Sequence, residues 1–411
     1  MKKLIVFSLA LLAIATSVLA ATPIPLLFSP IPWLNTSVLG TAIDISGITA
    51  YADEHKRPLF STLFNGMDIA RDITVIPNVK NTIALTRLTV GDGFRPYSST
   101  HEPRTGALNF SDRYLSTLTG KRDLLIDVQD FKTRHLAWRT RPGNAATKTV
   151  NDMDFAPFMW DQVMKGVGRE VNDETAFFGF DRTGVSAYAG ASTYVAGNRV
   201  TFVLNGVTEW FQATGAVAAN QSPQTNPALW RNVTARAVVP GIQSYIDAAI
   251  SGGFSVTATG AVTTAATAVS AHLALFRAMP VPYKNWGVII HSSWTDYEFL
   301  LDALATRTQN VLADTAGLIN RGYITLPETG GKCIVKPATW LGTSRRLIAE
   351  PIVMDNPADP YGANLVMGTD LLSDANTINV IQQVYGIQAG IKFDLGFQIS
   401  DLNALRLGNQ S

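Results

Sequence analysis

The chain has 411 residues and a net charge of +1, and charged residues make up 16% of it, below the usual share of about 25%. A nearly neutral chain offers no general basic surface, so its composition gives no support to a nucleic-acid binder or a membrane-surface binder. The single cysteine, Cys333, excludes an intramolecular disulfide and a metal site made of several cysteines. A large core and a surface covered by other protein would both explain the low charge.

Residues 1–20 have the form of a secretory signal peptide. Lys2 and Lys3 precede the apolar run Leu4–Ala15, and the small residue Ala20 suits a cleavage site. An over-extended gene start and a leader trimmed during assembly are the alternatives. We expect residues 1–20 to be absent from the mature protein, because about 12 apolar residues are costly to leave in water and too few to span a bilayer.

Residues 21–70 are predicted to form an N-terminal arm. Four prolines space its first half, which indicates an extended chain, and Leu59–Phe64 is predicted to anchor the arm in a core. From Asp72 to Val128, apolar and polar residues alternate as in β-strands. The polar, breaker-rich stretch Gly91–Gly106 interrupts the alternation, so residues 71–128 are predicted to be one long β-hairpin with an exposed tip. The hairpin could pack on a neighbouring subunit or fold back on its own domain, and the pattern leaves both open.

A long amphipathic helix is predicted over Asp154–Gly179, after a short helix at Asp130–Trp138 and a loop. Its apolar residues follow a period of 3.6, namely Trp160, Met164, Val167, Val171 and Phe178. Two ion pairs at helical spacing are expected, Asp161–Lys165 and Arg169–Asp173. Gly166 and Gly168 weaken the helix, each by roughly 1 kcal/mol.

The rest of the chain mixes further strands and helices. A strand is predicted at Val200–Leu204 and a helix at Ile242–Ile250, within a region rich in Ala, Gly and Thr. The strand Val288–Ile290 precedes a helix capped by Ser292 or Ser293. Near the end, Phe393, Leu395, Phe397 and Ile399 alternate with polar or small residues, as in a strand. Because strands and helices do not alternate as βα units, the fold class is predicted to be α+β.

Residues with catalytic chemistry do not form a recognisable constellation. The histidines lack metal-binding spacing, so each is interpreted as a surface or core residue: His55, His101, His135, His272 and His291. Gly330-Gly331-Lys332 is interpreted as a turn and Cys333 as a small core residue. Asp359, Asp370 and Asp374 could accept a cation, but turn residues are the preferred interpretation. No catalytic, cofactor-binding or metal-binding residue is therefore assigned, and a structural protein is favoured over an enzyme.

The order of these elements and several loose motifs resemble the major capsid proteins of tailed bacteriophages with the HK97-type fold, in particular those of phages of Bacteroidetes. The resemblance covers roughly residues 60–402 and rests on the long hairpin, the helix ending DETAFFG, and the segments VIIHSSWTDYEFLLDAL, GTSRRLIAEP, NLVMGTDLLSD and FDLGFQIS. It implies that residues 71–128 are the extended E-loop and that 129–184 with 345–411 are the peripheral domain. Residues 185–344 would then be the axial domain.

The resemblance also implies a function and partners. Such proteins self-assemble in the host cytoplasm into hexamers and pentamers of an icosahedral shell, which contacts portal and other head proteins and encloses double-stranded DNA. Contact with DNA would be non-specific, with Lys165 and Arg169 as candidates, although pairing with Asp161 and Asp173 is the preferred role of both. No cofactor and no stable membrane association are expected.

Two other classes of function remain open from the sequence. An exported bacterial surface or periplasmic binding protein would explain the signal-like residues 1–20, which conflict with assembly in the cytoplasm. An enzyme whose site is assembled from scattered residues is the third hypothesis. Particle formation separates the first hypothesis from these two.

Overall fold

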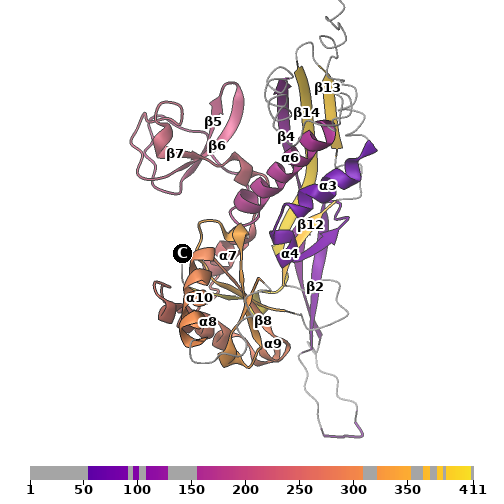
Figure 1. The fold of residues 1–411 in the computed structure, drawn as a ribbon, viewed down its shortest axis with the longest axis vertical. Coiled ribbons are helices and arrows are strands. Elements are labelled where there is room, and N and C mark those ends of the chain that lie inside the picture. The colour runs from indigo at the N-terminus through magenta and orange to yellow at the C-terminus, as the bar shows by residue number, and fades with distance from the viewer. Residues whose placement is uncertain are drawn as a thin grey trace, which may run out of the picture. The chain divides into compact units, whose positions relative to one another are not determined.

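The structure is a computed structural model that describes residues 54–90, 96–100, 108–127, 155–308, 322–352, 364–370, 377–382 and 386–408. These residues belong to one compact unit, Ile45–Ser411, and they combine helices and strands in mixed order, which confirms the α+β class (Figure 1). Residues 1–53, the predicted helix Asp130–Trp138, and Gly91–Gly106 apart from 96–100 lie outside the described residues.

The helices are α3 (Lys56–Asn65), α4 (Ile69–Asp72), α6 (Phe155–Glu170), α7 (Ile242–Ser251), α8 (Ala265–Ala278), α9 (Val281–Trp286) and α10 (Trp294–Thr308). The strands are β1 (Thr74–Pro77), β2 (Thr82–Val90), β3 (Leu108–Ser116), β4 (Leu118–Asp127), β5 (Arg199–Leu204), β6 (Val207–Ala213), β7 (Trp230–Asn232), β8 (Val288–Ser292), β9 (Ile324–Thr325), β10 (Cys333–Pro337), β11 (Ile348–Pro351), β12 (Leu365–Thr369), β13 (Thr377–Gln382), β14 (Gly386–Ile399) and β15 (Arg406–Leu407).

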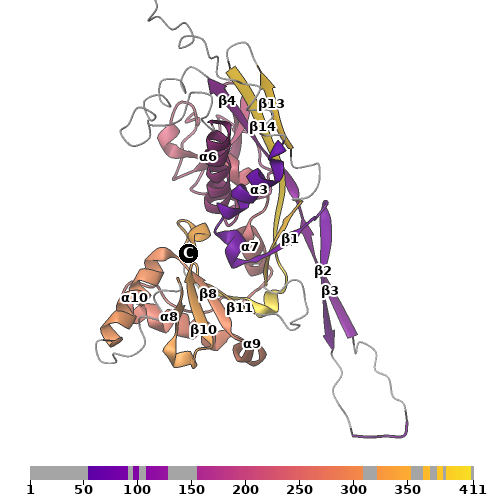
Figure 2. The same ribbon diagram turned by 45° about the vertical axis from the view of Figure 1, so that its right-hand side comes forward.

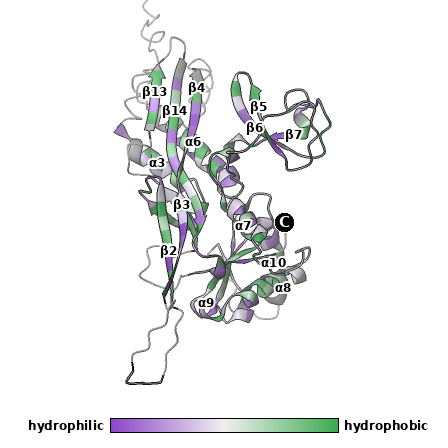
Figure 3. Cartoon of the chain, turned by 180° about the vertical axis from the view of Figure 1, so that it is seen from behind, coloured by the Kyte–Doolittle hydropathy of each residue, from purple (hydrophilic) through white to green (hydrophobic). Residues whose placement is uncertain are grey.

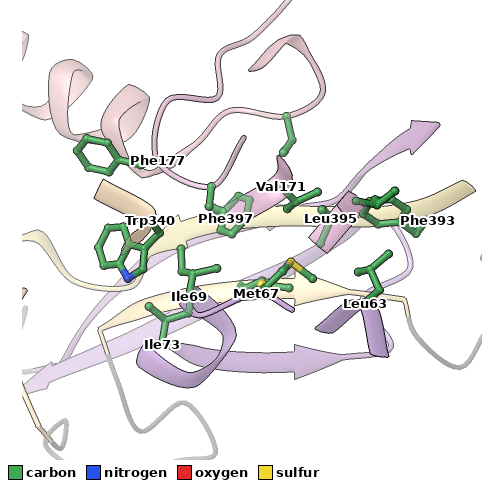
Figure 4. Packing of buried hydrophobic residues seen from close by; sticks show 14 of the residues in the cluster. Leu63, Met67, Ile69, Ile73, Val171, Phe177, Trp340, Phe393, Leu395 and Phe397 are labelled. Atoms are coloured by element: carbon green, nitrogen blue, oxygen red, sulfur yellow. The ribbon is translucent and has the colours of Figure 1, made fainter. Parts of the chain in front are cut away.

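The long strand β14 organises the first sheet. It pairs antiparallel with β12 through its C-terminal part and with β13 and β4 through its N-terminal part, and β1 adds parallel to β12. The alternation predicted for its C-terminal half is confirmed, since the four alternating apolar side chains are at most 4% exposed: Phe393, Leu395, Phe397 and Ile399. These side chains belong to the main core, and Figure 4 shows Phe393, Leu395 and Phe397 along β14 among other core residues.

The predicted amphipathic helix is observed as α6, and its apolar face packs into this core. Trp160, Met164, Val167 and Val171 are buried as the period of 3.6 predicts. The predicted anchor Leu59–Phe64 forms most of α3, and Leu59, Phe60 and Leu63 enter the same core. Figure 1 shows α3 and α6 lying over the strands of the first sheet.

The last turn of this helix differs from the prediction. After Glu170 the helix widens into a π-helical turn, η3 (Val171–Thr175). The predicted pair Asp161–Lys165 forms at 2.8 Å, but the predicted pair Arg169–Asp173 is wrong. The guanidinium Nε of Arg169 donates to the Lys165 carbonyl at 3.4 Å, and the Asp173 carboxylate accepts from Asn172 Nδ2 at 2.8 Å. The wider turn changes the angular spacing on which an i,i+4 pair depends.

The single long hairpin predicted for residues 71–128 is also corrected. Only β2 and β3 pair with each other, while β1 pairs with β12 and β4 pairs with β14. The sequences of β1, β2 and β4 alternate in the same way, so their different partners were not predictable from that alternation. Figures 1 and 2 show β2 and β3 continuing beyond the end of the sheet that contains β1 and β12.

The second sheet has the order β15-β11-β8-β10-β9, and its core includes residues of α8 and α10. The predicted strand Val288–Ile290 lies within β8, and the helix that follows is α10. Ser293 is the capping residue, because its Oγ accepts from the Asp296 amide at 3.2 Å. β11 and β15 belong to this sheet, so the strands of residues 345–411, which the resemblance assigns to the peripheral domain, divide between the two sheets.

Residues 180–240 form an inserted segment with its own small cores. The sheet β5-β6-β7 contains the predicted strand Val200–Leu204, and the clusters around Trp230 and Phe180 share no residue with the main core. Entry and exit lie side by side, since the Gly241 amide donates to the Gly179 carbonyl at 2.9 Å. A Cβ on Gly179 would lie 2.2 Å from the Val239 carbonyl oxygen, so this crossing requires glycine. The predicted helix Ile242–Ile250 follows as α7.

The two glycines within α6 are predicted to respond oppositely to alanine. A Cβ on Gly166 meets no atom within 4 Å, whereas one on Gly168 would lie 2.4 Å from the Leu63 carbonyl oxygen in α3. We expect Gly166→Ala to stabilise the fold by about 1 kcal/mol through helix propensity. Gly168→Ala should destabilise it by about 1–3 kcal/mol through overpacking. Urea unfolding of both variants measures this, and equal effects would contradict the close approach of α3 and α6.

Candidate functional site

The described histidines with complete burial have structural roles. His272 donates from Nδ1 to the Ala268 carbonyl at 2.7 Å and accepts at Nε2 from Ser292 Oγ at 3.3 Å. Burial lowers the pKa of His272, so this ring is neutral near pH 7. His291 Nε2 bonds to Glu350 at 2.7 Å, and the other oxygen of Glu350 accepts from the Leu365 amide at 2.9 Å. This glutamate joins the second sheet to the first.

The other candidate reactive or ligand-binding residues also have structural roles where the structure describes them. Cys333 is buried, and burial raises its pKa to about 12, so it is an unreactive core thiol. Gly330 and Gly331 have positive φ, as in the predicted turn. Asp370 is buried, whereas Asp359 and Asp374 lie outside the described residues. Within the described ranges, no group of three or more His, Cys, Asp or Glu side chains is placed to hold a metal ion.

None of the described helices is both long and apolar enough to cross a bilayer.

The ribbon formed by β2 and β3 has one face that packs on the described residues and one face that does not. Its register pairs Thr82 with Ser116 at the base and Val90 with Leu108 at the far end. Because side chains alternate between the faces of a strand, this register gives the ribbon two distinct faces. We call the face that contains Leu85, Arg87, Arg113 and Leu115 the inner face. The opposite one, the outer face, contains Ala84, Thr86, Leu88, Leu108, Phe110, Asp112 and Tyr114.

The inner face is attached to the rest of the chain. Leu85 and Leu115 are at most 2% exposed and pack with Ile76, Val79 and Val366. Farther along the ribbon, Arg113 donates to Gln398 Oε1 at 3.0 Å, and Arg87 pairs with Asp401. Burial lowers the pKa of Arg113, which still leaves this guanidinium charged at neutral pH.

Two facing glycines allow the base of the ribbon to approach the first sheet. Gly368 of β12 and Gly396 of β14 are cross-strand partners. A Cβ on Gly396 would lie 2.2 Å from the Ser116 carbonyl oxygen, and one on Gly368 would lie 2.9 Å from Leu115 Cδ2. Any larger residue at Gly396 would push the backbone of the ribbon away from the sheet.

The outer face is exposed and largely apolar. Leu88 is 49% exposed, Leu108 56%, Phe110 69% and Tyr114 58%. Leu88 and Phe110 are directly opposed across the two strands, where side chains are close enough to contact. Figure 3 shows hydrophobic residues along both strands. An exposed, largely apolar face of this kind marks an interaction surface.

The sequence contained the signal for this surface. Leu88, Phe110 and Tyr114 stand at even-numbered positions of the two arms, whereas Leu85 and Leu115 stand at odd-numbered positions. Apolar residues therefore occur on both faces of the predicted strands. Such a pattern alone predicts a strand covered on both faces. The structure adds that the residues it describes cover only one of them.

The two candidates for DNA contact lie beside a hollow between α3 and α6. The hollow has a volume of about 490 Å³, and its lining includes Asn65, Asp68, Asp161, Lys165 and Arg169. Lys165 pairs with Asp161. Arg169 has no carboxylate partner among the described residues, and its Nε donates to the Lys165 carbonyl.

No protein-family model and no curated protein matches this chain. Solved structures similar to it include a subunit of the procapsid of satellite phage P4, with 11% identity and a TM-score of 0.45, over 86% of this chain and 90% of that chain. The capsid of Myoviridae phage XM1 has 12% identity and a TM-score of 0.44, over 83% of this chain and 90% of that chain. A virus-like particle from Pyrococcus furiosus has 9% identity and a TM-score of 0.35, over 87% of this chain and 99% of that chain.

The two faces of the ribbon predict opposite effects on stability. Leu85→Ala should cost about 2–5 kcal/mol, because it removes buried atoms beneath the ribbon. Phe110→Ala should change the free energy of unfolding by no more than about 0.5 kcal/mol in the dissociated chain, because the ring is exposed. Denaturant unfolding at low protein concentration measures both. A large loss in Phe110→Ala would mean that the outer face packs on its own chain.

Proposed function

We propose that the chain is a major capsid protein, a structural subunit that binds further copies of itself through the outer face of the β2–β3 ribbon. The observation that carries this proposal is the combination of a fixed inner face with an exposed apolar outer face. An isolated two-stranded ribbon is at best marginally stable in water. This one is held by its inner face, and contact with another subunit would remove its outer face from water.

A second copy of the chain is the occupant that fits best. The outer face contains one charged side chain, Asp112, beside apolar residues and Thr86, so it suits an uncharged protein surface rather than a polyanion. Charged residues make up only 16% of the chain, as expected for a subunit with much of its surface in contacts. Burial of about 800 Å² on each partner would form a standard stable interface.

The finer proposal follows the order of the elements. The ribbon is the E-loop, α6 is the spine helix, and the first sheet belongs to a peripheral domain. The second sheet belongs to an axial domain, to which β11 and β15 are now assigned. On this proposal, hexamers and pentamers form an icosahedral shell around double-stranded DNA and contact a portal and other head proteins. No enzymatic activity is proposed.

Assembly should depend on the outer face. Phe110→Asp adds a second charge to the outer face, two residues from Asp112. Desolvation of the new charge opposes binding, and we expect folded subunits that no longer form shells. Val203→Asp is the matched control, because Val203 is also an exposed strand residue, at 59% against 69% for Phe110, but lies on β5. Sedimentation velocity and electron microscopy of both variants and the unmodified chain give the result.

Normal shells from Phe110→Asp would remove the outer face from the proposal. A discrete monomer from the unmodified chain under all conditions would favour the exported binding protein instead.

Contact with DNA should depend on Arg169 more than on Lys165. We expect Arg169→Gln to reduce the dependence of log K on log salt for duplex DNA by about 0.9, the value for one phosphate contact. Lys165→Gln should leave this slope unchanged, because Lys165 pairs with Asp161, and should cost at most about 1 kcal/mol of stability. Titration of a duplex at several salt concentrations measures both. Equal slopes for the two variants and the unmodified chain would place this hollow away from the DNA.

A further inference from the structure

The inner face of the ribbon carries an ion pair that is distinct from its apolar attachment. Arg87 of β2 forms an ion pair with Asp401, and its Nη2 also donates to the Tyr283 hydroxyl at 3.1 Å. Tyr283 belongs to α9, and its hydroxyl lies 3.5 Å from the Asp401 carboxylate. One guanidinium therefore joins the ribbon to the end of β14 and to a helix beside the second sheet.

Asp401 is itself held rigidly. Its side-chain Oδ1 accepts from the Asn403 amide at 2.9 Å. Its backbone amide donates to Asn364 Oδ1 at 2.7 Å, and its carbonyl accepts from Asn364 Nδ2 at 2.9 Å. The residue is 6% exposed. Separation of Arg87 from Asp401 would leave a buried carboxylate without its cation. Because an unpaired buried charge is costly, the paired arrangement is strongly favoured.

The ribbon joins the body through short connections at its base. Thr117 alone separates β3 from β4, and its amide donates to the Asn81 carbonyl at 2.7 Å. Asn78 and Asn81 have φ angles of 62° and 106°, which turn the chain sharply between β1 and β2. Arg87 lies five residues beyond Thr82, a distance of about 17 Å along a strand. A contact there resists rotation about the base far better than a contact at the base itself.

We propose that Arg87 and Asp401 form a latch that holds the ribbon in one direction relative to the two sheets. The inference rests on the proposed function, because the latch fixes the angle at which the outer face meets another copy. Leu85 and Leu115 attach the base, while Arg87 sets the direction of the part beyond it. Arg87 is thus a positioning residue for assembly.

The test measures the direction of the ribbon in the full-length, unassembled chain. Spin labels are attached at Asp112→Cys on the outer face and at Ser270→Cys on α8, and the distance between them is measured by pulsed electron resonance. The native Cys333 is buried and stays unlabelled. The latch is removed by Arg87→Met with Asp401→Asn, because asparagine keeps the acceptor for the Asn403 amide and no buried charge is left. Lys121→Met with Asp123→Asn removes an exposed pair of β4 as the control.

We expect a narrow distance distribution in the labelled parent and in the control, and a distribution broader than the label's own rotamer spread in the latch variant. Arg87→Lys keeps the charge but not the simultaneous contact with Tyr283, so it should broaden the distribution less. Arg87→Lys also tests the latch if the double variant fails to fold. An unchanged narrow distribution in the folded latch variants would overturn the proposal. Failure of the unmodified chain to form shells would sink the proposed function, while the distances would still decide the latch.

Discussion

A two-stranded ribbon has two faces, and the described residues of this chain cover only one of the faces of β2 and β3. Leu85 and Leu115 pack beneath the ribbon, so its inner face is satisfied within the subunit. Phe110 and Tyr114 remain exposed on the other face. The described residues leave that apolar area in water, so the free energy of removing it is available to a partner that packs there. The proposed function, its partner and the role of Arg87 all depend on this asymmetry.

Close backbone approach at glycine positions produces the arrangement that supports the ribbon. Gly368 and Gly396 face each other across β12 and β14 and leave room for the base of the ribbon. Gly168 allows α3 to approach α6 on the core side. The same glycines that cost helix or strand propensity therefore set the distances between layers, and larger side chains there would separate the layers.

The elements that the sequence predicted well are those whose pattern arises from one local period. The burial of Trp160 and Met164 follows from the helical repeat, and the burial of Phe393 and Leu395 follows from strand alternation. The prediction failed where the partner is distant in sequence. β1 and β4 alternate like β2 and β3 but pair with strands near the C-terminus. The π-helical turn was also missed, because Asn172 within it is held by distant residues, Ile69 and Thr339. Its wider spacing is the reason that the predicted partner of Arg169 was wrong.

Solvent footprinting of the outer face tests the central claim most directly. Hydroxyl-radical labelling of Phe110 and Tyr114, followed by mass spectrometry, compares the dissociated chain with its assembled particles, with the exposed Tyr97, which is 94% exposed and lies beyond β2, as a third reporter. The account predicts strong labelling of Phe110 and Tyr114 in the dissociated chain and protection of both in the particles. Equal labelling in the two states would contradict it, because the apolar outer face would then remain in water after assembly.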